Sequence, residues 1–98
     1  MPLHYSEPQI IELAKTANDV YTIDIHIRLP RNSPSTVTYI YEAVDQDGNP
    51  KGHKPLTETV ADIQADDPAN FVIAYQILKE RAYRKAPAAG FPAGGTIL

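Results

Sequence analysis

Alternation between apolar and polar side chains is clearest just after the first twenty residues. Residues 21–29 place an apolar side chain at every second position, with polar ones between. Successive side chains of a strand point to opposite faces, so this pattern predicts a strand with one buried and one solvated face. Residues 36–45 predict a second strand, with Tyr39 and Tyr41 on one face and Ile40 on the other. Because both of its faces are partly apolar, we expect it to be covered by a helix on one side and a partner on the other.

Helical spacing and start signals predict a first helix over residues 6–19. Ser6 and Gln9 have the spacing of a capping box, and Pro8 falls in the first turn, where its missing N–H costs nothing. The apolar residues that follow recur at helical intervals and would form one buried stripe. They are Ile10, Leu13, Ala14 and Ala17.

A second helix is predicted over residues 68–86, with Asp67 and Pro68 as its N-cap and first residue. Its first half is apolar nearly all round, although a helix on one sheet needs only a single stripe. Phe71, Ala74, Leu78 and Ala82 supply that stripe. Val72, Ile73 and Ile77 point elsewhere, so we expect either the first helix or another subunit to cover them.

Turn formers and small residues occupy the remaining segments. Residues 45–52 should reverse the chain. Residues 56–64 could hold a third strand or a short helical turn opened by Thr59 and Asp62, and we favour a short strand leading into that turn. The sequence therefore predicts an α+β fold of order α-β-β-(β)-α over residues 1–86. Its antiparallel sheet has two or three strands, with both helices on one face. Residues 87–98, rich in Pro, Gly and Ala, are expected to form an extended C-terminal arm.

Composition narrows the class of protein. A chain of 98 residues has the size of one domain, and the absence of cysteine excludes disulfides and thiolate metal sites. The formal net charge of −3 does not favour binding to nucleic acid. The N-terminus lacks the features of a signal peptide, and no stretch has the length of a transmembrane segment. We therefore expect a protein that is cytoplasmic or incorporated into a particle, without contact with a membrane.

Two groups of residues have spacings that could support a metal site or acid–base chemistry. Asp45, Asp47 and Asn49 have the spacing of a calcium loop, but the glycine and glutamate that such a loop needs further on are missing, which favours a plain turn. His26 could act as an acid or base beside Glu42 across the hairpin. The simpler interpretation, which we favour, is a solvent-facing histidine in a charged cross-strand cluster. We expect no enzyme activity, no catalytic residue, no cofactor, no metal and no small-molecule substrate.

Basic residues gather at the end of the second helix and leave a second interpretation open. Lys79, Arg81, Arg84 and Lys85 surround Tyr83 and could bind an anionic partner. Cations in a last helical turn also interact favourably with the helix dipole, which accounts for them without a ligand.

The leading functional prediction is a non-enzymatic structural or interaction subunit of a larger protein assembly, such as a component of a virus particle or tail. It would bind copies of itself or other subunits through the arm and the helix over residues 68–86. The alternative is a small regulatory or inhibitory module that recognises a protein or nucleic acid through the basic end of that helix. The residues expected to contact partners are Tyr39, Tyr41, Val72, Ile73, Ile77, Phe91, Ile97 and Leu98.

Overall fold

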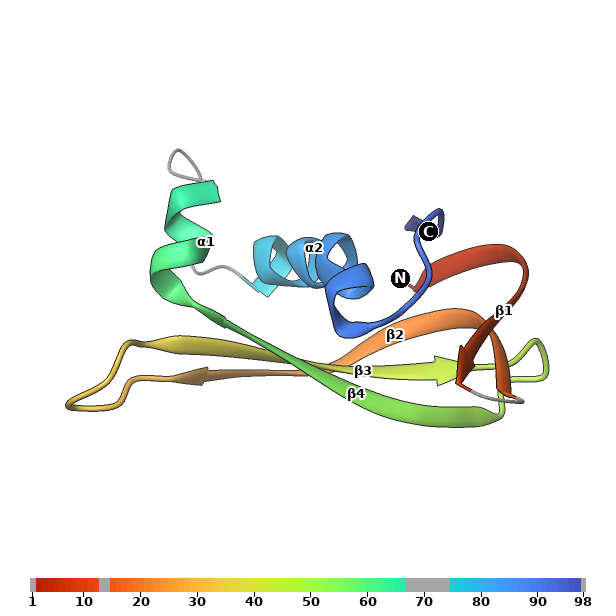
Figure 1. Ribbon diagram of the computed structural model, residues 1–98, viewed down its shortest axis with the longest axis horizontal. Coiled ribbons are helices and arrows are strands. Elements are labelled where there is room, and N and C mark those ends of the chain that lie inside the picture. The colour runs from red at the N-terminus through yellow and green to blue at the C-terminus, as the bar shows by residue number, and fades with distance from the viewer. Residues whose placement is uncertain (1, 13–14, 67–74, 98) are drawn as a thin grey trace.

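A five-stranded antiparallel sheet in the order β4-β3-β2-β1-β5 forms the body of the protein (Figure 1). The computed structural model describes residues 2–12, 15–66 and 75–97, with the side chains of all of them except residues 12 and 75–77. The strands are β1 (Leu3–Glu12), β2 (Lys15–Arg28), β3 (Thr36–Val44), β4 (Pro50–Thr59) and β5 (Thr96–Ile97). The helices α1 (Val60–Asp66), α2 (Tyr75–Lys85) and the 3-10 helix η1 (Ala86–Ala89) all lie over one face of the sheet.

The α+β class is confirmed, but the predicted sheet of two or three strands and the predicted first helix are wrong. Residues 6–12 belong to β1 and residues 15–19 to β2, and the two strands pair from Leu3 opposite Val20 to Glu12 opposite Lys15. Leu13 and Ala14 of the predicted stripe lie outside the described residues. Leu3 and Tyr5 are buried in the core, whereas Ile10, expected in a buried stripe, is 73% exposed. The capping signals at the start of the segment are local preferences, and pairing with β2 together with burial of the strand overrides them.

The centre of the sheet is β3, whose residues Val37, Tyr39, Tyr41 and Ala43 face the helices and are fully or almost fully buried. Leu78 and Ala82 of α2 are buried in the same core. The Tyr41 hydroxyl donates to the carbonyl of Ala82 at 2.6 Å, which ties the helix to the strand. The predicted helix cover on this face of β3 is thus confirmed.

A β-bulge divides β2 into two parts. Thr22 and Ile23 together lie opposite Tyr41 of β3. The extra residue reverses the phase of alternation, so Tyr21 and Ile25 lie on opposite faces of the sheet. The prediction that this strand buries one whole apolar face is therefore wrong.

The C-terminal residues fold back onto the sheet instead of forming an extended arm. Phe91 is buried and meets the Tyr41 ring edge to face, with 5.5 Å between the ring centroids. The Tyr5 hydroxyl donates to the carbonyl of Pro92 at 2.7 Å, and β5 pairs with the start of β1. The two ends of the described chain consequently lie close together (Figure 1).

Two further predictions concern the connections between elements. The chain reverses after β3 through a tight turn in which the Gly48 N–H donates to the Asp45 carbonyl at 3.0 Å, as the turn formers predicted. The strand followed by a helical turn predicted for residues 56–64 corresponds to the end of β4 and to α1. Residues 67–74, the first part of the predicted second helix, lie outside the described residues.

Among the described residues, none of the helices combines the length and the apolar character needed to cross a membrane.

Candidate interaction surface

The second half of β2 has a neighbouring strand on one side only. β3 pairs with β2 as far as Arg28, but β1 pairs with it no further than Val20. In Figure 1, β1 lies along the right-hand part of β2, and the left-hand part runs on to the β2–β3 turn without it. Within the described part of the chain, residues 21–28 therefore form an open edge of the sheet, which we call the free edge of β2.

Large apolar side chains are exposed along this free edge. Ile23 is 47% exposed, Ile27 43% and Leu29, just after the strand, 76%. Ile25 between them is only partly buried against the core. Natural proteins usually protect such an edge with lysine, proline or a covering element, because an exposed apolar edge pairs with other chains. This edge carries neither lysine nor proline from residue 21 to residue 28.

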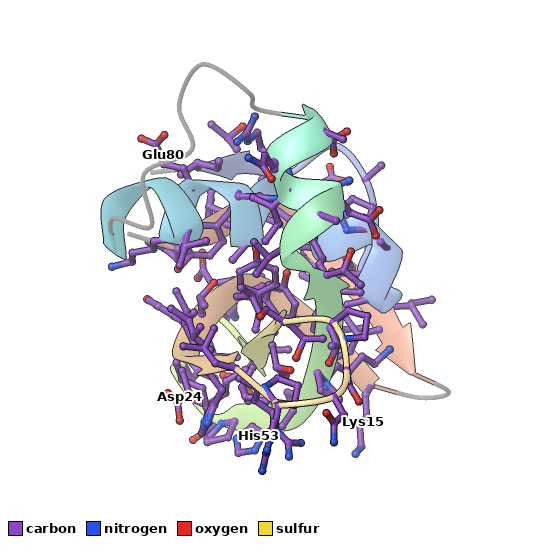
Figure 2. All side chains as sticks on the ribbon, turned by 90° about the vertical axis from the view of Figure 1, so that its left-hand side faces the viewer. Lys15, Asp24, His53 and Glu80 are labelled. Atoms are coloured by element: carbon purple, nitrogen blue, oxygen red, sulfur yellow. The ribbon has the colours of Figure 1, made fainter. Side chains whose placement is uncertain are left out.

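The other face of the free edge is polar. Asp24, His26 and Arg28 alternate with the isoleucines, and the Asp24 carboxylate bonds the His26 ring at 2.8 Å. Arg28 makes no ion pair with any of the residues that the structure describes. Figure 2 shows Asp24 on the side of the sheet away from the helices, and Glu80 of α2 on the opposite side. The free edge is thus amphipathic, with an apolar row towards the helices and a charged row away from them.

Two backbone donors of this part of β2 are bonded to side chains. The Thr22 N–H donates to the Tyr83 hydroxyl at 3.1 Å, and the Ile25 N–H donates to Asp24 Oδ1 at 2.9 Å. A donor that bonds a side chain in this way is not bonded to β3, so it points towards the open side of the strand. The Asp24 bond is solvent-exposed, and the carbonyl of a docking strand can replace it.

The three histidines each bond a carboxylate. His4 bonds Asp19 at 2.6 Å, and His53 bonds Glu42 at 2.8 Å. Glu42, the predicted neighbour of His26, is thus bonded to His53, while His26 is bonded to Asp24. The described residues contain no group of three or more side chains suited to holding a metal ion.

Arg81, expected at a basic surface, instead lies in a buried ion-pair network between α2, β4 and α1. Arg81 is only 2% exposed. Its guanidinium donates to both carboxylate oxygens of Glu58, at 2.9 and 2.7 Å, and to Asp66 at 2.9 Å. Lys85 adds a contact with Asp66 at 3.5 Å. Arg81, Arg84, Lys85 and Asp66 line a hollow of about 380 Å³, in which Arg81 and Lys85 already lie beside the Asp66 carboxylate.

The network shifts the titration of its members. Burial acts to raise the pKa of Glu58, but hydrogen bonds from Arg81 and Tyr39 outweigh it, so this pKa lies below its ordinary value. The hydrogen bond from Arg81 also lowers the pKa of Asp66. Burial, followed by the hydrogen bond to Glu58, raises the pKa of Tyr39. The ionised carboxylates are therefore part of the folded structure at neutral pH.

Asp45, which has the spacing of a calcium ligand in the sequence, stabilises the β3–β4 turn. Its Oδ1 accepts the backbone N–H of Asp47 and of Asn49, each at 2.9 Å. The bond from the Asn49 N–H is the main cause that lowers the Asp45 pKa; desolvation opposes it, and the bond from the Asp47 N–H adds to the lowering. These bonds explain the alternating Asp and Asn residues as turn chemistry.

The residues predicted to contact partners are scattered through the molecule. Tyr39, Tyr41 and Phe91 are buried within the chain's own core. Ile97 is 36% exposed in β5. Val72, Ile73, Leu98 and the side chain of Ile77 lie outside the described residues. Of the predicted contact residues whose side chains the structure describes, none lies in the free edge of β2.

Sequence reasoning assigned the exposed residues Ile23, Ile27 and Leu29 to a buried face. Apolar and polar residues alternate strictly along this strand, but alternation does not show whether a neighbouring element covers the apolar face. No family model, curated protein or solved structure matches this chain. The geometry of its own residues is therefore the basis for proposing a function.

Proposed function

We propose that this chain is a non-enzymatic subunit of a larger protein assembly and binds a strand of another protein chain along the free edge of β2. The observation that carries the proposal is the exposure of Ile23, Ile27 and Leu29 beside an unpaired strand edge. An added strand satisfies the open backbone groups, and alternate side chains supply specificity.

We assign the partner contacts to the free edge of β2 instead of to the arm and helix predicted from the sequence. Tyr39, Tyr41 and Phe91 are buried in the folded chain, so they support the core and are not available to a rigid docking partner. The assembly prediction requires apolar surface that the folded chain does not cover by itself, and the free edge of β2 provides such a surface.

The alternative, a regulatory or inhibitory module that uses the basic end of α2, has weaker support. Arg81 is buried against Glu58, and Lys85 lies 3.5 Å from Asp66. An anionic partner would have to compete with carboxylates that are already in place.

Site-specific photo-cross-linking in cells that naturally produce the protein tests the docking surface. We expect a photoreactive phenylalanine analogue at Ile27 to give a cross-linked product of higher mass, because a bound strand lies beside this side chain. The matched control carries the analogue at Ile10, which is 73% exposed but belongs to β1. No product at Ile27, or equal products from both positions, would contradict the proposal.

A further inference from the structure

The charges along the free edge of β2 complement those of a second, antiparallel copy of the same strand. We propose that the free edge pairs with the free edge of an identical chain, with a two-fold axis passing beside His26. This inference rests on the proposed function and names the partner, which is a second copy of this chain. It joins the two five-stranded sheets of the copies into one continuous sheet.

The pairing follows from the order of side chains. With the axis at His26, Asp24 of each copy lies directly opposite Arg28 of the other. Opposite charges in directly facing positions stabilise an antiparallel pair. On the other face Ile25 lies opposite Ile27, and Ile23 lies opposite Leu29, so the two exposed apolar rows merge.

The neighbouring registers fit less well. With the axis at Ile25, Arg28 faces Thr22 and loses its carboxylate. With the axis at Ile27, Arg28 faces His26 and Asp24 faces Pro30, which has no N–H to donate. A shift by a single position would place polar residues opposite apolar ones, because side chains alternate between faces. Of the registers that preserve the faces, the one centred on His26 pairs both charges.

Hydrogen bonding within the free edge is consistent with this register. The Ile25 N–H, now bonded to Asp24 Oδ1, faces the open side of the strand. In the dimer this N–H donates to the carbonyl of Ile27 in the second copy. The Asp24 carboxylate then becomes available to Arg28 of that copy, which makes no ion pair with the described residues of its own chain.

Charge reversal in the purified full-length chain tests the pairing by sedimentation velocity. We expect the wild type to form a species of twice the 10.8 kDa chain mass. Asp24→Arg creates two Arg–Arg contacts and Arg28→Asp two Asp–Asp contacts, so each should raise the dimer dissociation constant about tenfold or more. An equimolar mixture of the two variants should associate as tightly as the wild type, because each arginine then faces an aspartate. Glu80→Arg, an exposed charge reversal on α2, is the matched control and should leave the dimer dissociation constant unchanged.

The results distinguish a failure of the self-pairing proposal from a failure of the proposed function. A wild type that stays monomeric at millimolar concentration, with a cross-link from Ile27 to a different protein, overturns the self-pairing and leaves the proposed function standing. Absence of both the dimer and the cross-link overturns both. A dimer whose dissociation constant is unchanged in both variants, or is not restored in the mixture, overturns the register at His26.

Discussion

At the scale of single residues, the most constrained group is the Arg81 guanidinium. It is buried and donates to Glu58 through two hydrogen bonds and to Asp66 through a third. A buried ion pair of this kind adds little stability compared with an apolar replacement, but removing one partner leaves an uncompensated charge in the interior. The network therefore requires β4, α1 and α2 to keep their positions relative to one another.

Glu58→Gln should lower the free energy of unfolding by about 3 kcal/mol at neutral pH, because Arg81 loses its bidentate carboxylate. Urea denaturation followed by circular dichroism measures the change. Glu42→Gln, which alters a partly exposed carboxylate bonded to His53, is the control and should change the free energy of unfolding by no more than about 0.5 kcal/mol. Equal effects of the two substitutions would contradict the structural role of the network.

The pH dependence of stability should report the same carboxylates. The pKa of Glu58 is lowered in the folded chain, so its ionised form is favoured by folding. The stabilisation is complete above the ordinary glutamate pKa of 4.5 and is lost as the pH falls through the lower folded value. Thermal melts between pH 7 and pH 2 should show a steeper acid loss for the wild type than for Glu58→Gln. Parallel pH profiles would count against this assignment.

At the scale of elements, the sequence predicted those parts of the fold that depend on neighbouring residues. The apolar face of β3, the β3–β4 turn and the passage from β4 into α1 each follow from patterns within a few positions. The Arg81 network was not predicted, because its carboxylates are 15 and 23 residues away along the chain. Interactions over such separations leave no periodic signal in a single sequence.

The hairpin of β1 and β2 illustrates the same limit. Residues 6–19 carry good helix start signals, yet Leu3 and Tyr5 are held in the sheet by β2, β5 and Pro92. These partners lie up to 87 residues away from Tyr5, so tertiary contacts decide the conformation. The bulge at Thr22 and Ile23 likewise depends on the packing of β2 against β3 and could not be predicted from the alternation.

The C-terminal segment should behave as part of the core and not as a detachable arm. Phe91→Ala should lower the free energy of unfolding by about 3 to 5 kcal/mol, because it leaves a cavity beside the Tyr41 ring. Ile97→Ala is the control; Ile97 is partly exposed in β5, and its truncation should cost less than about 1.5 kcal/mol. Chemical denaturation measures both variants, and a Phe91→Ala effect as small as the control would contradict this packing.

At the scale of the whole molecule, the fold is elongated. Its principal extents are 41, 26 and 18 Å, and its radius of gyration is 14.1 Å. A compact domain of this length has a radius of gyration of about 13 Å. The β2–β3 hairpin reaches one end of the long axis, beyond α2 (Figure 1). The end of the free edge next to the β2–β3 turn lies in this projecting part of the sheet, where another chain can approach it, whereas Thr22 is bonded to Tyr83 of α2.

Thermal stability should therefore depend on protein concentration. If only the folded chain pairs through β2, mass action couples association to folding, and each tenfold increase in concentration should raise the melting temperature by about 3 °C. Ile27→Lys should make the melting temperature independent of concentration, because an edge lysine opposes strand pairing. Ile10→Lys, on β1, should retain the concentration dependence of the wild type. Differential scanning fluorimetry over a hundredfold concentration range measures this slope separately from any direct effect of the substitutions on the monomer. A slope that Ile27→Lys leaves unchanged would show that the free edge of β2 does not hold the assembly together.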